Sequence, residues 1–80
     1  MKTTPIDPAL LCEKYTEGYD VIDGRGWHCG KVLRGREGST LIVRMGRRGV
    51  CEYVFAPTYS MDTVLAAAAR VHGLFLASEE

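Results

Sequence analysis

The sequence lacks the features that mark a secreted or membrane-bound protein. Its opening, Met1 to Pro8, contains no apolar core of a signal peptide. No apolar run is long enough to span a bilayer, because Arg70, His72 and Gly73 interrupt the longest candidate helix. Cysteine is scarce, and an odd count of three predicts free thiols rather than a disulfide framework. We therefore expect a cytoplasmic protein with no membrane partner.

Residue patterns that carry catalysis or metal binding are also missing. No Ser/His/Asp set, paired-carboxylate pocket or glycine-rich phosphate loop ahead of a helix can be assembled. His28 and Cys29 are neighbours on a predicted strand, so their side chains point to opposite faces and do not form a nucleophile–base pair. The three cysteines include no Cys-x-x-Cys pair, which disfavours a zinc site. We expect no enzyme activity, no catalytic residue, no cofactor and no metal.

The length of 80 residues predicts a single domain over residues 1–80 with a thin core. Net charge is zero, but the charge is unevenly distributed. The segment from Arg25 to Arg48 holds seven basic residues and one acidic residue, whereas the rest of the chain holds three basic and nine acidic residues. The middle of the chain is therefore the part that would attract an anion.

Hydrophobic periodicity predicts an α+β fold. Asp7 and Gly18 bracket a short N-terminal helix, and alanine-rich spacing after Ser60 predicts a long C-terminal helix that ends or bends at Gly73. The expected elements are a helix over Pro8–Glu17, a weak strand over Tyr19–Ile22, strands over Trp27–Leu33, Thr40–Met45 and Val50–Phe55, and the long helix. We predict a small antiparallel sheet of three to four strands, with the long helix packed on one face.

Both faces of this sheet carry apolar residues. Cys51, Tyr53 and Phe55 are expected to point to the core, which leaves Val50 and Val54 on the opposite face. Three arrangements would cover that second face: the short helix packs on it, the sheet curls into a small barrel, or a partner binds there. If the partner is a second copy of this chain, the protein is a homodimer; otherwise we expect a monomer.

Arginines near glycine-rich turns are the strongest functional signal. Guanidinium groups are always charged and grip phosphate or carboxylate in a bidentate way, and nearby aromatic rings can stack on bases. The candidate binding residues are Trp27, Lys31, Arg34, Arg36, Arg44, Arg47 and Arg48. The competing interpretation is that these arginines only solubilise hairpin ends and that the aromatic residues belong to the core.

Three resemblances bear on function. Thr63 to Ala69 resembles the alanine-rich second helix of double-stranded-RNA-binding domains, but Ser60-Met61-Asp62 replaces that family's phosphate-gripping lysines, so the function is not carried over. The strands from Trp27 to Phe55 resemble the strand rhythm of Tudor and other SH3-like barrels. Three strands followed by a helix also resemble domains that lay a sheet in the DNA major groove, a mode that suits Lys31 and Arg44.

These observations favour a non-catalytic binding module. Its basic hairpin surface would engage nucleic acid or the acidic surface of a nucleic-acid-handling protein complex. The alternative is a small inhibitor or adaptor of the phage or mobile-element type, anti-CRISPR-like, which blocks a host defence complex by protein–protein contact.

Overall fold

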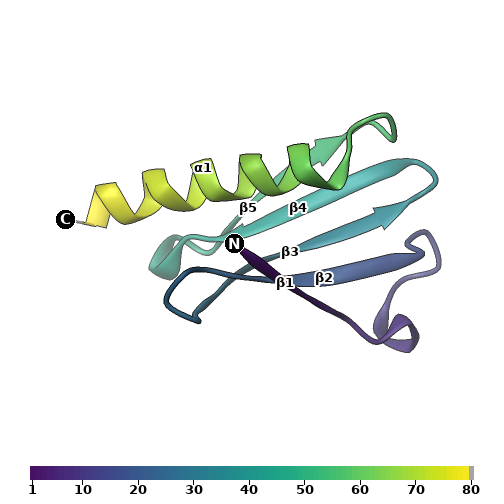
Figure 1. Ribbon diagram of the computed structural model, residues 1–80, viewed down its shortest axis with the longest axis horizontal. Coiled ribbons are helices and arrows are strands. Elements are labelled where there is room, and N and C mark those ends of the chain that lie inside the picture. The colour runs from purple at the N-terminus through teal and green to yellow at the C-terminus, as the bar shows by residue number, and fades with distance from the viewer. Residues whose placement is uncertain (80) are drawn as a thin grey trace.

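The protein forms a five-stranded antiparallel sheet with one long helix across it (Figure 1). The computed structural model describes residues 1–79. The strands follow one another in the order β1-β2-β3-β4-β5, so β1 and β5 form the two edges. The elements are β1 (Lys2–Pro5), a 3-10 turn η1 (Pro8–Leu10), β2 (Glu17–Ile22), β3 (His28–Gly35), β4 (Gly38–Arg44), a 3-10 turn η2 (Gly46–Arg48), β5 (Val50–Phe55) and α1 (Met61–Glu79).

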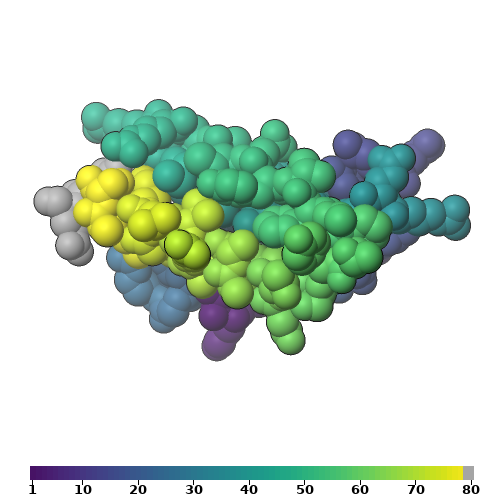
Figure 2. Space-filling view, turned by 90° about the horizontal axis from the view of Figure 1, so that it is seen from above, coloured from purple at the N-terminus to yellow at the C-terminus, as the bar shows by residue number. Residues whose placement is uncertain are grey.

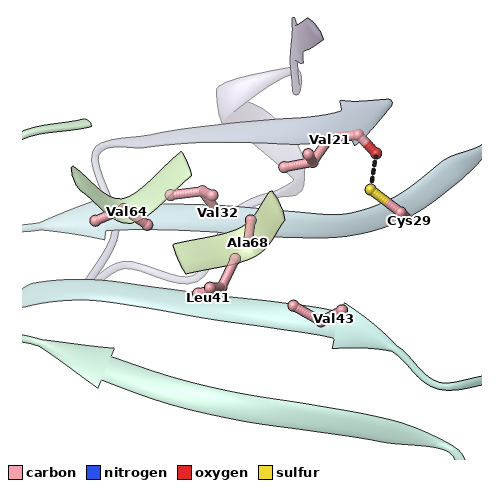
Figure 3. Packing of buried hydrophobic residues seen from close by; sticks show 7 residues of the cluster. All are labelled: Val21, Cys29, Val32, Leu41, Val43, Val64 and Ala68. Carbon is pink, nitrogen blue, oxygen red and sulfur yellow. Dashed lines mark hydrogen bonds between the residues drawn. The ribbon is translucent and has the colours of Figure 1, made fainter. Parts of the chain in front are cut away.

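The core lies between the helix and one face of the sheet (Figure 3). Alternate residues of the three central strands point to this helix face, because side chains alternate along a strand. They meet Val64 and Ala68 of α1, which are separated by one helical turn. The buried apolar residues are Val21, Cys29, Val32, Leu41, Val43, Val64 and Ala68.

Cys29 enters this core through an irregularity in the sheet. The β2–β3 register shifts between Val21 and Ile22, where Ile22 pairs with His28 and Val21 with Gly30. The extra residue on β3 is Cys29, as expected of a β-bulge. Its thiol donates a weak hydrogen bond to the Val21 carbonyl at 3.4 Å.

The long helix begins where the sequence predicts. The Ser60 Oγ accepts a hydrogen bond from the Thr63 N–H at 3.2 Å, which caps the first turn. The helix contacts β4 and β3. It continues through Gly73 without ending there. No helix among the described residues is both long and apolar enough to cross a membrane.

The predicted N-terminal helix over Pro8–Glu17 is wrong. Asp7 does cap a helical turn by accepting from the Ala9 N–H at 3.0 Å, but the turn is the single 3-10 turn η1. The following chain instead places Leu11 and Tyr15 on the sheet face opposite α1, which we call the open face. The Tyr15 hydroxyl is 2.9 Å from the Thr40 Oγ1. Packing on the sheet therefore overrides a weak local preference for helix.

The predicted strand count of three to four is also wrong, because the sheet has five strands. The missed strand is β1, whose threonines pair with β2 in the register Thr3↔Val21 and Thr4↔Asp20. The other predicted strands are present with slightly different limits. Residues 6–16 cover part of the open face, but as an irregular segment with one 3-10 turn and not as the short helix that the first of the three alternatives supposed.

Tyr53 is the main correction to the predicted core. It lies on the helix face but is 41% exposed. The reason is that α1 lies over β3 and β4 and leaves β5 largely uncovered. Figure 2 shows β5, in teal-green, running along the surface beside the yellow-green helix.

Candidate nucleic-acid interface

The structure divides the predicted binding residues between two ends of the sheet (Figure 1). Arg34 and Arg36 lie at the β3–β4 turn, which we call the Arg36 end. The β2–β3 and β4–β5 connections, residues 23–28 and 44–49, lie at the other end, which we call the Trp27 end. The seven residues of β4 separate the two ends by about 20 Å, at about 3.4 Å per residue.

At the Arg36 end, Arg34 is engaged with its own chain. Its Nε lies 3.9 Å from the Glu17 Oε1, and its guanidinium donates to the Tyr59 carbonyl at 3.2 Å. Lys31 belongs to neither end, because it sits in mid-strand opposite Ile42 on the open face. The structure therefore gathers Trp27, Arg44, Arg47 and Arg48 at one end, away from Arg34, Arg36 and Lys31.

The β2–β3 turn at the Trp27 end is organised by one carboxylate. The Asp23 Oδ1 accepts hydrogen bonds from the backbone N–H groups of Arg25 at 2.9 Å and Trp27 at 3.0 Å. This arrangement bends the chain so that the Arg25 guanidinium lies 4.1 Å from the centre of the Trp27 ring. Trp27 itself stays 63% exposed. The turn therefore presents a cation and an aromatic ring as one unit.

Asp23 also ties the turn to the helix. Its Oδ2 accepts from His72 Nε2 at 3.1 Å and from the Arg25 guanidinium at 3.2 Å, and both Asp23 and His72 are buried. The pKa of Asp23 is lowered to about 2, and the hydrogen bond from the Trp27 N–H is the largest cause. Burial acts in the opposite direction and raises the pKa. The remaining lowering comes from the Arg25 N–H and from the His72 and Arg25 side chains. The Asp23 carboxylate is therefore charged at neutral pH and neutralises part of the local positive charge.

Arg44 is held in place by a second chain of hydrogen bonds on the neighbouring strands. Its guanidinium lies 3.4 Å from the His28 Nδ1, while the His28 Nε2 donates to the Asp20 Oδ1 at 2.9 Å. The Arg44 guanidinium can only donate, so the His28 Nδ1 is the acceptor in this contact. His28 thereby helps to orient Arg44.

These groups surround an open hollow of about 530 Å³ at the Trp27 end. Arg25, Trp27, His28 and Arg44 line it from the sheet side, and Phe75 lines it from the helix. Gly46 completes the wall, with a φ of +60° that its lack of a side chain allows. The next two residues in the chain are Arg47 and Arg48, both exposed on η2. Arg25 and Arg44 are therefore the positive residues in the lining of the hollow, and Arg47 and Arg48 follow its lining residue Gly46 in the chain.

Cysteine and histidine at this end show no arrangement for nucleophilic chemistry. Cys29 is buried, and burial, followed by the charge of Asp23, raises the pKa of its thiol, which keeps the thiol protonated at neutral pH. His28 contacts Asp20 and Arg44 instead. Among residues 1–79, no three His, Cys, Asp or Glu side chains gather in a way that would hold a metal ion.

Sequence reasoning missed two members of this site, Arg25 and His72. The signal for Arg25 was present in the stretch Asp23-Gly24-Arg25-Gly26-Trp27. An aspartate followed by glycine is typical of an Asx-turn, which places the next residues around the carboxylate. His72 gave no local signal, since it lies 49 residues from its partner Asp23. Comparisons with protein families, curated proteins and solved structures found no match to this chain.

Proposed function

We propose that this protein is a non-catalytic binding module whose Trp27 end takes single-stranded nucleic acid. The observation that carries the proposal is the Arg25 guanidinium stacked on an exposed Trp27 ring beside a hollow lined by Arg44. Base stacking on an aromatic ring combined with cations along the backbone is how sequence-tolerant single-strand binding works. One base would stack on Trp27, while phosphates would contact Arg25, Arg44, Arg47 and Arg48.

The proposal uses only part of the basic segment found in the sequence. Arg34 is held by Glu17 and the Tyr59 carbonyl, and Arg36 lies about 20 Å away along the sheet. Among the side chains that the structure describes, the Trp27 end holds Arg44, Arg47 and Arg48, together with Arg25, which pairs with Asp23 at 3.2 Å. The carboxylates of Asp20 and Asp23 already accept hydrogen bonds. The excess positive charge on this surface is what would attract a polyanion.

The chain provides its own reporter for the test, because Trp27 is its only tryptophan. Titration with a single-stranded oligonucleotide should quench Trp27 fluorescence, and affinity should fall steeply as salt is added. Each phosphate contact on a single strand contributes about 0.7 to the slope of log affinity against log salt. Replacing Arg47 and Arg48 together with Ala should therefore lower the slope by about 1.4.

A matched control removes two positive charges elsewhere. Lys14→Ala combined with Arg70→Ala changes the net charge by the same amount at exposed positions outside the Trp27 end. If both double variants lower the slope equally, binding is a property of net charge and the proposed interface is wrong. If no oligonucleotide quenches Trp27 at low salt, nucleic acid is not the ligand.

The protein-contact alternative shares this surface and is separated by the same variants. An inhibitor or adaptor that recognises an acidic protein surface would ignore oligonucleotides. It would retain one protein from a nuclease-treated lysate, and the Arg47→Ala/Arg48→Ala variant would lose that protein. The exposed tryptophan with its stacked arginine favours the nucleic-acid version, because bases offer flat rings for stacking.

A further inference from the structure

We propose that two copies of this chain pair through the edge of β5, which joins their sheets into one ten-stranded antiparallel sheet. The pairing itself does not depend on the proposed nucleic-acid function. It rests on the backbone of β5, on the side chains that this strand exposes, and on the difference between the two edges of the sheet.

The outer edge of β5 pairs with no strand among residues 1–79. At the β4–β5 turn the Met45 N–H donates to the Gly49 carbonyl at 2.8 Å. Hydrogen-bonded and non-hydrogen-bonded pairs alternate along an antiparallel ladder, so Cys51 and Tyr53 bond inward to β4. The backbone groups of Val50, Glu52 and Val54 therefore point outward, ready to bond to another strand.

Apolar side chains are exposed along this edge on both faces of the sheet. Val54 is 81% exposed and Val50 57% exposed on the open face, while Tyr53 is 41% exposed on the helix face. Figure 2 shows β5 lying uncovered next to α1. Exposed strands of this kind are a ready template for pairing with another chain.

The two edges of the sheet differ in how they are protected. β1 is four residues long and carries Lys2 and Pro5, two residues that natural proteins use to block edge pairing. β5 has neither lysine nor proline, and its pairing with β4 is regular, without a bulge. Only β5 is therefore suited to pairing, and a contact between two β5 strands closes as a dimer instead of growing into a fibre.

Glu52 selects the register of this pairing. A two-fold axis at Glu52 would place it directly opposite the partner's Glu52, and like charges in that position are destabilising. An axis at Cys51 would pair Val54 with the partner's Arg48, and an axis at Val54 would pair Glu52 with the partner's Ala56; both of these partners lie outside β5. With the axis at Tyr53, Glu52 faces the partner's Val54, the two Tyr53 rings face each other, and both helices lie on the same side of the sheet.

This register has a consequence for the basic residues. Because the partner strand runs in the opposite direction, the Arg36 end of one copy lies at the same end of the ten-stranded sheet as the partner's Trp27 end. Arg36 would then stand near the partner's Arg47 and Arg48. This step rests on the proposed nucleic-acid function, whereas the pairing of β5 does not.

Sedimentation of the purified chain over a dilution series tests the pairing without any ligand. The wild type should shift from monomer to dimer as concentration rises, because one strand per partner makes a small interface. Val54→Glu should stay monomeric, because it places a second carboxylate opposite the partner's Glu52. Leu10→Glu, at a position 77% exposed on η1, should dimerise like the wild type. A wild type that stays monomeric, or a Val54→Glu variant that dimerises equally well, overturns the proposal.

Disulfide trapping tests the register. In a Cys12→Ser background, Tyr53→Cys should form a covalent dimer on mild oxidation, because residues across a two-fold axis in a non-hydrogen-bonded pair lie about 4.5 Å apart at Cα, within disulfide range. The Cys12→Ser chain alone should not cross-link. Cross-linking through the native Cys51 would contradict the Tyr53 axis.

The Arg36→Ala variant tests whether the dimer forms a shared basic end. It should weaken oligonucleotide binding only at protein concentrations at which the dimer forms. Weaker binding at all concentrations would contradict the shared basic end.

Discussion

Gly18 offers a direct test of how residues 6–16 cover the open face. It is a buried residue of β2, and a β-carbon added there would lie 2.8 Å from the Leu11 Cδ2 and 3.1 Å from the Leu33 Cδ2. Ile6 lies slightly farther, at 3.4 Å. Gly18→Ala would therefore press on the segment that replaces the expected N-terminal helix. The backbone at Gly18 has no positive φ, so alanine fits the main chain.

The expected cost is the difference between two effects. Adding a methyl group to a packed site costs about 1–3 kcal/mol, while replacing glycine by alanine recovers about 0.4–1 kcal/mol by restricting the unfolded chain. The atoms that the new methyl group meets are the ends of leucine side chains, which can shift. We therefore expect Gly18→Ala to lower the free energy of unfolding by about 1 kcal/mol. In a Leu11→Ala background the tightest contact is gone, so the same substitution should cost close to nothing.

A double-mutant cycle in urea measures this coupling. Unfolding of the four proteins, followed by circular dichroism and Trp27 fluorescence, should give an interaction energy of about 1 kcal/mol between positions 11 and 18. Gly24→Ala is a matched control, because a β-carbon at Gly24 would meet no atom within 4 Å. Additive effects within about 0.5 kcal/mol would show that Leu11 does not lie over Gly18, and the described packing would be wrong.

Two further predictions concern buried titratable groups. The pKa of Asp23 is about 2 in the folded protein against a normal value of 3.8. The charged carboxylate therefore stabilises the fold fully above pH 3.8, and this stabilisation is lost as the pH falls through about 2. The free energy of unfolding measured against pH should show this loss, and Asp23→Asn should reduce it. The thiols should react with a disulfide reagent in the order Cys12, Cys51, Cys29, because Cys12 is exposed and burial raises the pKa of Cys29. In urea all three thiols should react at one rate.

Local patterns predicted much of the fold. Strand alternation located β3, β4 and β5, because apolar residues alternate along each of them, although only β3 and β4 contain buried residues. The Asp7 and Ser60 caps were also predictable, since a cap needs only the residues of its own turn. These features depend on neighbours within a few positions along the chain, which is the range over which sequence periodicity carries information.

The errors arose where distant contacts decide the structure. β1 is stable only because it pairs with β2, and residues 8–17 leave the helical conformation because Leu11 and Tyr15 pack on the open face. Tyr53 follows the strand alternation correctly but stays exposed, since the position of α1 over β3 and β4 cannot be read from β5 itself. Pairing and coverage of this kind are properties of the folded sheet.

The arginines show why a cluster in sequence need not be a cluster in space. Arg34 lies at the end of β3, next to the β3–β4 turn, and Arg44 is the last residue of β4. The full length of β4 therefore separates them, and they lie at opposite ends of the sheet. A single chain therefore offers a polyanion either the Trp27 end or the Arg36 end. The proposed antiparallel pairing through β5 would reverse one copy relative to the other and bring unlike ends together. Under that proposal, the oligomeric state would determine how many arginines one ligand can meet.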